Sequence, residues 1–277
     1  MRLLVAGADR VDAGKTTFST GLVDRLDGTG FKPRAGNDYW FDHDDYLTAT
    51  DQGRLYGKDA RRLARASEGA MDVSTLNPIH RLWRPSPGGG SGLLGRSDRT
   101  FVCDRVAGSF VVNADAAVPR SARDALRLED AVEVSTVAEL DEVMERRHLP
   151  ALEAVGRRIV ETDRAVVESY ADIARPLQGV VDGQDARDLY DAVVVVAPGR
   201  VRVYDGQRYV RATAVASASP RDGRMERRVE DVVKHLDPMV TLSLSPLEEE
   251  RRTDPGAVAG AYADVYDRIL EAARSGR

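Results

Sequence analysis

Residues 2–17 constrain the fold of this chain more than any other stretch. An apolar run at residues 3–6 predicts a short buried strand, and residues 14–17 read Gly-Lys-Thr-Thr at the start of a helical apolar pattern. A strand, a small-residue loop and a helix in this order direct the backbone N–H groups of the loop and helix N-terminus toward one anion. The sequence therefore predicts a phosphate-binding loop and an α/β fold around it.

The side chains of this segment fit a nucleoside triphosphate with Mg²⁺. Lys15 would reach the β- and γ-phosphates, and the Thr16 hydroxyl would be a Mg²⁺ ligand. Asp9 stands where the strict phosphate-loop pattern has glycine, with Gly7 two residues earlier. An ordinary strand–turn–helix with Lys15 in solvent is the alternative interpretation. The residues predicted to bind ATP are Asp12, Ala13, Gly14, Lys15, Thr16 and Thr17.

Composition excludes several classes of protein. A single cysteine, Cys103, rules out a disulfide framework and a cysteine-rich metal site. No stretch approaches the ~20 apolar residues of a membrane span, so we expect a cytoplasmic protein without a membrane partner. A net charge of −5 argues against a nucleic-acid surface. A homodimer is left open.

Strands and helices alternate along most of the chain. This alternation predicts a mainly parallel sheet with helices on both faces, in one P-loop NTPase domain spanning residues 1–277. Residues 97–115 are predicted to form an inserted β-hairpin, and Asp205-Gly206 to form the turn of another within a C-terminal strand-and-helix part at residues 190–277. Residues 137–162 are predicted to be helical, with a break near Pro150.

Acidic residues supply candidate metal ligands. Glu168 ends the apolar run of residues 165–167, where a strand would deliver it to the carboxyl edge of the sheet. A strand-end acid paired with an arginine is the alternative. Asp104 is a rival, although the neighbouring Ala107-Gly108 pattern favours a turn residue. Asp45, in the acidic run of residues 42–45, is the candidate for a second metal carboxylate, and a solvated loop is the other interpretation of that run.

Several segments together resemble dethiobiotin synthetase and related P-loop NTPases of the SIMIBI class. The loop at residues 7–16 is similar to that family's phosphate loop, and Lys32-Pro33 matches the Lys-Pro that ends its second strand. Asn77-Pro78 and Ser86-Pro87 are similar to its Asn-Pro and Ser-Pro segments, and residues 165–168 to its apolar strand ending in Glu. The resemblance covers about half the chain in separate pieces.

The resemblance implies roles for individual residues. Lys15 and Thr16 would bind phosphate and Mg²⁺, Lys32 would face a carboxylate or carbamate substrate, and Glu168 would ligate metal, with Asp45 as a further ligand. The Gly-Ala-Gly-Gly loop that follows the acid in this family is absent, since residues 169–172 read Ser-Tyr-Ala-Asp. We therefore expect a related enzyme with another substrate rather than dethiobiotin synthesis.

Three functions remain in competition. The first is an ATP- and Mg²⁺-dependent enzyme in which Lys15 and Lys32 help phosphorylate or activate a small carboxylate or carbamate acceptor. The second is a nucleotide-switched binding or assembly ATPase of the same fold class. The third is a polynucleotide or nucleoside kinase, for which arginine-rich residues 61–65 and 224–228 would form a channel. By analogy of fold, nucleobase recognition is expected at residues 244–247.

Overall fold

The computed structural model describes residues 1–8, 13–69, 71–86, 93, 99–177, 189–216 and 227–276. These residues form two compact units, each built around its own sheet. The first unit consists of Met1–Pro33, Arg62–Met71 and Gly156–Arg277, and the second of Arg34–Arg61 and Asp72–Val155.

The first unit contains a six-stranded sheet with the order β11-β10-β9-β1-β8-β2. Strands β2, β8, β1 and β9 run parallel, whereas β10 and β11 run antiparallel to their neighbours. The strands are β1 (Arg2–Gly7), β2 (Thr29–Phe31), β8 (Ala165–Glu168), β9 (Ala192–Ala197), β10 (Arg200–Asp205) and β11 (Val240–Ser243). The parallel strands are almost wholly buried, because helices cover both of their faces.

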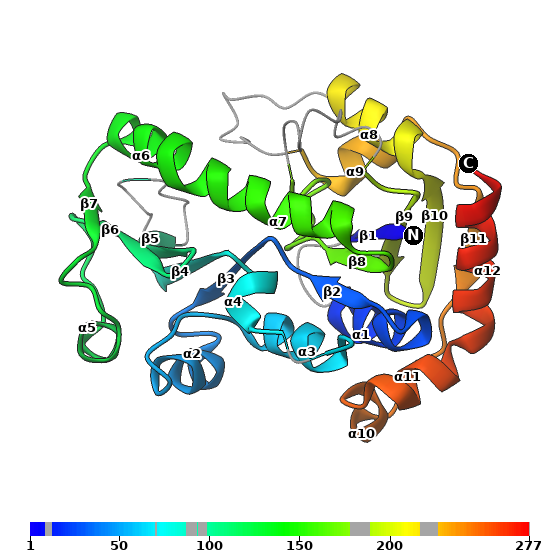
Figure 1. Cartoon of the computed structure of the whole chain (residues 1–277), viewed down its shortest axis with the longest axis horizontal. Coiled ribbons are helices and arrows are strands. Elements are labelled where there is room, and N and C mark those ends of the chain that lie inside the picture. Colours follow the sequence, from blue (N-terminus) through cyan, green and yellow to red (C-terminus); the bar gives the residue numbers. More distant parts are fainter. Residues whose placement is uncertain are drawn as a thin grey trace. The chain divides into compact units, whose positions relative to one another are not determined.

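Helices α1 (Lys15–Leu26), α11 (Pro255–Ala261) and α12 (Ala263–Ser275) cover one face of this sheet (Figure 1). Phe18 and Leu22 of α1 pack with Tyr266 and Ile269 of α12 over alternate residues of the strands, such as Val194. Helix α8 (Gly206–Val215) contacts β9 and β10, and α9 (Val229–Val233) packs against α8. Because strands β2, β8, β1 and β9 are parallel, their carboxyl ends lie at the same edge of the sheet.

The second unit contains a five-stranded sheet with the order β3-β4-β5-β6-β7. Its outer pairs, β3 with β4 and β6 with β7, are parallel, and its inner pairs are antiparallel. The strands are β3 (Arg34–Asp38), β4 (Ile79–Pro85), β5 (Arg99–Val106), β6 (Ser109–Asn113) and β7 (Val132–Val134). An apolar cluster that includes Tyr46, Leu82 and Val102 forms the core next to this sheet.

The other helices that the structure describes range from four to thirteen residues. They are α2 (His43–Thr50), α3 (Lys58–Ala66), α4 (Val73–Leu76), α5 (Arg120–Ala125), α6 (Val137–Val143), the π-helical η1 (Met144–His148), α7 (Leu149–Glu161) and α10 (Glu249–Arg252). The helical prediction for residues 137–162 is confirmed, and the irregularity that precedes Pro150 is this π-helical segment.

The α/β class is confirmed, and both sheets are mixed rather than purely parallel. The hairpin predicted within residues 97–115 is present as β5 and β6. The hairpin predicted at Asp205-Gly206 is wrong, because β10 pairs back onto β9 and the Asp205 carboxylate caps α8 by accepting from the Arg208 N–H at 2.7 Å. Aspartate suits a helix N-cap as well as a turn, and here the helix forms.

Candidate functional site

Glu168 is the last residue of β8 and lies directly beside β1, where its backbone is in register with Val5. Its side chain is fully buried, although it carries a carboxylate. The Ser169 N–H then donates to the Val5 carbonyl at 2.9 Å and fixes the chain as it leaves the sheet. The strand therefore delivers a carboxylate to the edge at which β1 turns toward α1.

Two predicted site residues meet Glu168 at the same oxygen. The Thr16 hydroxyl donates to Glu168 Oε1 at 2.9 Å, and Lys32 Nζ donates to the same atom at 2.5 Å. Lys32 and Glu168 form an ion pair with side-chain exposures of 5% and 0%. Burying one of these charges without the other would cost several kcal/mol, so each stabilises the other in the interior.

The second carboxylate oxygen differs from the first. Glu168 Oε2 is buried and has no hydrogen-bond partner among the described residues. A buried acceptor without a partner costs about 1–3 kcal/mol, and such groups in native proteins call for an explanation, such as an unseen water or ion. Mg²⁺ prefers carboxylate and hydroxyl oxygens, so Glu168 and Thr16 together fit this ion.

The phosphate-loop prediction rests on Gly7, Gly14 and Lys15. Gly14 precedes α1 with φ 77°, a left-handed conformation that glycine adopts without strain. A Cβ at Gly7 would lie 2.7 Å from Lys15 Nζ and 3.1 Å from the Ala171 carbonyl oxygen. Lys15 therefore folds back over the end of β1, and a Cβ at Gly7 would have to displace its ammonium group.

The other predicted phosphate-binding residues have varied surroundings. Ala13 is buried, and Thr17 Oγ1 accepts a hydrogen bond from Arg62 Nη2 at 3.3 Å. Asp12 lies outside the described residues.

Asp45 belongs to the second unit, on helix α2 rather than in a loop. Its Oδ2 accepts from Asn37 Nδ2 at 2.6 Å and from the Lys58 N–H at 2.7 Å, and its Oδ1 faces Arg61 Nη2 at 3.2 Å. Burial raises the pKa of Asp45 above its ordinary value, against the opposing effect of these donors. Its metal-binding role stays a prediction.

Asp104 is not a turn residue, which corrects the sequence interpretation: it lies within β5 and is fully buried. Arg81 donates two hydrogen bonds to the Asp104 carboxylate, from Nε to Oδ1 at 2.7 Å and from Nη2 to Oδ2 at 2.6 Å. His148 Nε2 lies 2.9 Å from Oδ2. Burial alone would raise the pKa of Asp104, but Arg81 and His148 together hold it well below its usual range. Sequence reasoning missed His148, and the only signal was a histidine next to the apolar Leu149.

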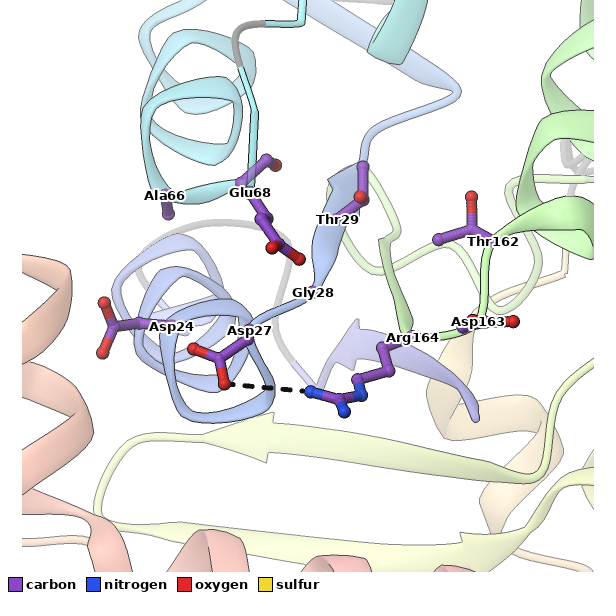
Figure 2. Close-up of a pocket in the computed structure, with 10 residues that line it drawn as sticks. Asp24, Asp27, Gly28, Thr29, Ala66, Glu68, Thr162, Asp163 and Arg164 are labelled. Carbon is purple, nitrogen blue, oxygen red and sulfur yellow. Dashed lines mark ion pairs between the residues drawn. The ribbon is translucent and has the colours of Figure 1, made fainter.

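One cavity of the first unit lies away from these residues. It measures about 540 Å³ and is lined at the start of β2 and just before β8 by acidic side chains, among them Asp24, Asp27 and Glu68. Figure 2 shows Asp27 and Arg164 facing one another there, with their charged atoms 3.8 Å apart. These are the amino ends of the strands, whereas ligands of parallel α/β sheets bind at the carboxyl ends.

Within the described ranges, no three histidine, cysteine, aspartate or glutamate side chains gather as a metal-binding group. A Mg²⁺ ion would therefore need phosphate and water to complete its coordination. Among the helices that the structure describes, none is long and apolar enough to cross a membrane. Comparison with protein-family models, curated proteins and solved structures found no significant match to this chain.

Proposed function

We propose that the chain binds a nucleoside triphosphate, ATP in the first instance, together with Mg²⁺ at the carboxyl edge of the first sheet. The observation that carries the proposal is the buried cluster in which Thr16 and Lys32 share Glu168 Oε1 while Glu168 Oε2 has no partner among the described residues. An incomplete set of oxygen ligands beside a glycine-bounded loop and a helix N-terminus suits a phosphate-bound metal ion.

Each residue has a part in this proposal. Lys15, folded over Gly7, would neutralise the phosphates, and Glu168 with the Thr16 hydroxyl would hold the ion. Mg²⁺ supplies charge neutralisation at the transferring phosphoryl group. Lys32 shares Glu168 with Thr16, and we propose that it also binds the carboxylate or carbamate of a small acceptor, which the enzyme phosphorylates or activates.

Calorimetric titration of ATP, GTP and ADP with Mg²⁺ tests nucleotide binding. Lys15→Ala should weaken triphosphate binding by ~1.5–3 kcal/mol, because a hydrogen-bonded charge is lost. The matched control is Lys58→Ala, which removes the same charge from an exposed position in the second unit. Absence of triphosphate binding in the folded wild type would overturn the proposal.

The role of Lys32 in turnover needs a substitution that keeps its charge. Lys32→Ala would leave Glu168 buried without its cation and would endanger the fold. Lys32→Arg keeps the charge but changes the donor geometry. We expect it to retain triphosphate binding and lose acceptor-stimulated release of ADP, and unchanged turnover would argue against acceptor binding at Lys32.

A nucleotide-switched binding protein is the second candidate. The segment after Glu168 is tied to residues 227–229 by backbone hydrogen bonds, Ala174 N–H to Arg227 O and Val229 N–H to Asp172 O, and by the Asp172–Arg228 ion pair at 3.4 Å. A structural change at Glu168 on nucleotide binding would therefore be transmitted through this segment to α9. Nucleotide-dependent assembly without turnover would favour this function over the enzyme.

A further inference from the structure

A second cavity of the first unit begins at the phosphate loop. It measures about 270 Å³, and it is lined by Ala8, Arg202, Val229, Glu230, Val233 and Lys234. Ala8 is the first residue after β1, and its N–H donates to the Val196 carbonyl of β9 at 2.8 Å. The cavity therefore opens beside the backbone that leads into the loop between β1 and α1.

Arg202 forms the wall contributed by β10. Its neighbours Val201 and Val203 belong to the core beneath α1 and α12, so strand alternation turns Arg202 to the opposite face of the sheet. The guanidinium lies 6.0 Å from the centre of the Tyr204 ring. Arg202 Nε is buried and has no hydrogen-bond partner among the described residues.

Helix α9 provides the other wall. Val229 is fully buried and Val233 is partly buried, which gives an apolar surface. Glu230 is exposed, and Lys234 forms an ion pair with Asp231 at 3.6 Å. The cavity thus combines an apolar wall, a planar cation and a hydrogen-bond-accepting carboxylate.

The geometry points to a purine nucleobase as the occupant of this cavity. Flat heteroaromatic rings stack on guanidinium planes and on apolar side chains, and the Glu230 carboxylate would accept from an exocyclic amine of adenine or guanine. The volume lies just below the ~300–1,000 Å³ of pockets for drug-sized ligands, which suits one base. The inference rests on the proposed function, since the loop beside Ala8 would hold the phosphates of the same nucleotide.

The surroundings of residues 244–247, where base recognition was expected, favour this relocation. Leu244 and Leu247 pack against the apolar core of the first unit, and the Leu244 N–H donates to the Gly199 carbonyl at 2.8 Å. These partly buried leucines already pack against the core, whereas the cavity at Arg202 leaves space for a ligand.

Titration of the full chain with ATP, GTP and tripolyphosphate, each with Mg²⁺, tests the inference. Tripolyphosphate has no base, so the ratio of nucleotide to tripolyphosphate affinity isolates the contribution of the cavity. Arg202→Gln should lower this ratio about 5- to 150-fold, the range of one stacking contact. Glu230→Gln, an exposed substitution that spares folding, should lower it about tenfold for the preferred purine.

Arg200→Gln is the matched control, because Arg200 lies on the same strand, carries the same charge and is exposed outside the cavity. It should leave the ratio unchanged. Equal affinities of the wild type for nucleotide and tripolyphosphate, or unchanged ratios in Arg202→Gln and Glu230→Gln, would overturn the inference while leaving the phosphate loop intact. Failure of both ligand types to bind would instead overturn the proposed function.

Discussion

The two units each bury a carboxylate completely, and the comparison separates a structural acid from a candidate functional one. Asp104 of the second unit has both oxygens bonded, to Arg81 and His148. Glu168 of the first unit has both of its donors on Oε1 and none on Oε2 among the described residues. Burial and ion pairing are common to both sites. What distinguishes Glu168 is the unfilled position at one oxygen.

The largest expected effect comes from the fully bonded acid. Asp104→Asn removes the charge that balances the largely buried Arg81 guanidinium and weakens the contact with His148, so the free energy of unfolding should fall by ~3–5 kcal/mol. Urea denaturation monitored by circular dichroism measures this change. Asp124→Asn, which affects only an exposed pair with Arg120, is the control and should leave stability unchanged. A loss as small as that of the control would mean that the Asp104 cluster is not a stabilising network.

Glu168→Gln should cost about 3 kcal/mol, at the lower end of the range for Asp104→Asn. It leaves the Lys32 cation buried without its counter-charge, but the amide oxygen can still accept from Thr16 and Lys32. Asp104, in contrast, is bonded to two groups, Arg81 and His148. The same denaturation experiment compares the two variants directly. A larger loss for Glu168→Gln would reverse the proposed contrast between the acids.

The sequence made the meeting of Thr16, Lys32 and Glu168 predictable. The apolar run before Glu168 indicates a buried strand, and parallel strands bring their carboxyl ends to one edge. The Asp104 cluster was not predictable, because its partners come from a neighbouring strand and from the π-helical segment, 23 and 44 residues away. Asp205 was misread for a related reason, since the pairing of β10 with β9 decides between its turn and cap roles.

The stability of the wild type should depend on pH more steeply in acid than the stability of Asp104→Asn. The folded-state pKa of Asp104 is depressed, so its contribution to stability is present above the unfolded pKa of ~3.9 and is lost as the pH falls toward the folded value. Below about pH 4 this single group adds at most ~1.4 kcal/mol per pH unit to the slope of stability against pH. Denaturation at several pH values should show a shallower slope in Asp104→Asn. Equal slopes would contradict the depressed pKa.

The smallest expected effect concerns the N-terminal cap of α6, the helix that precedes the π-helical segment with His148. Thr136 begins α6 with a capping box, in which its hydroxyl accepts from the Glu139 N–H at 3.2 Å. Thr136→Ala should cost ~1 kcal/mol, and Thr136→Ser should retain most of the cap. Thermal unfolding of the two variants provides the measurement. No difference between them would show that this cap does not stabilise the helix leading to His148.

The most direct test of the central claim is the Mg²⁺ dependence of ATP binding in the wild type and in Glu168→Gln. If Glu168 Oε2 is the position left for the ion, Mg²⁺ should strengthen ATP binding by the wild type at least about tenfold and have little effect on the variant. Equal responses of the two folded proteins to Mg²⁺ would contradict the claim that Glu168 Oε2 binds the ion.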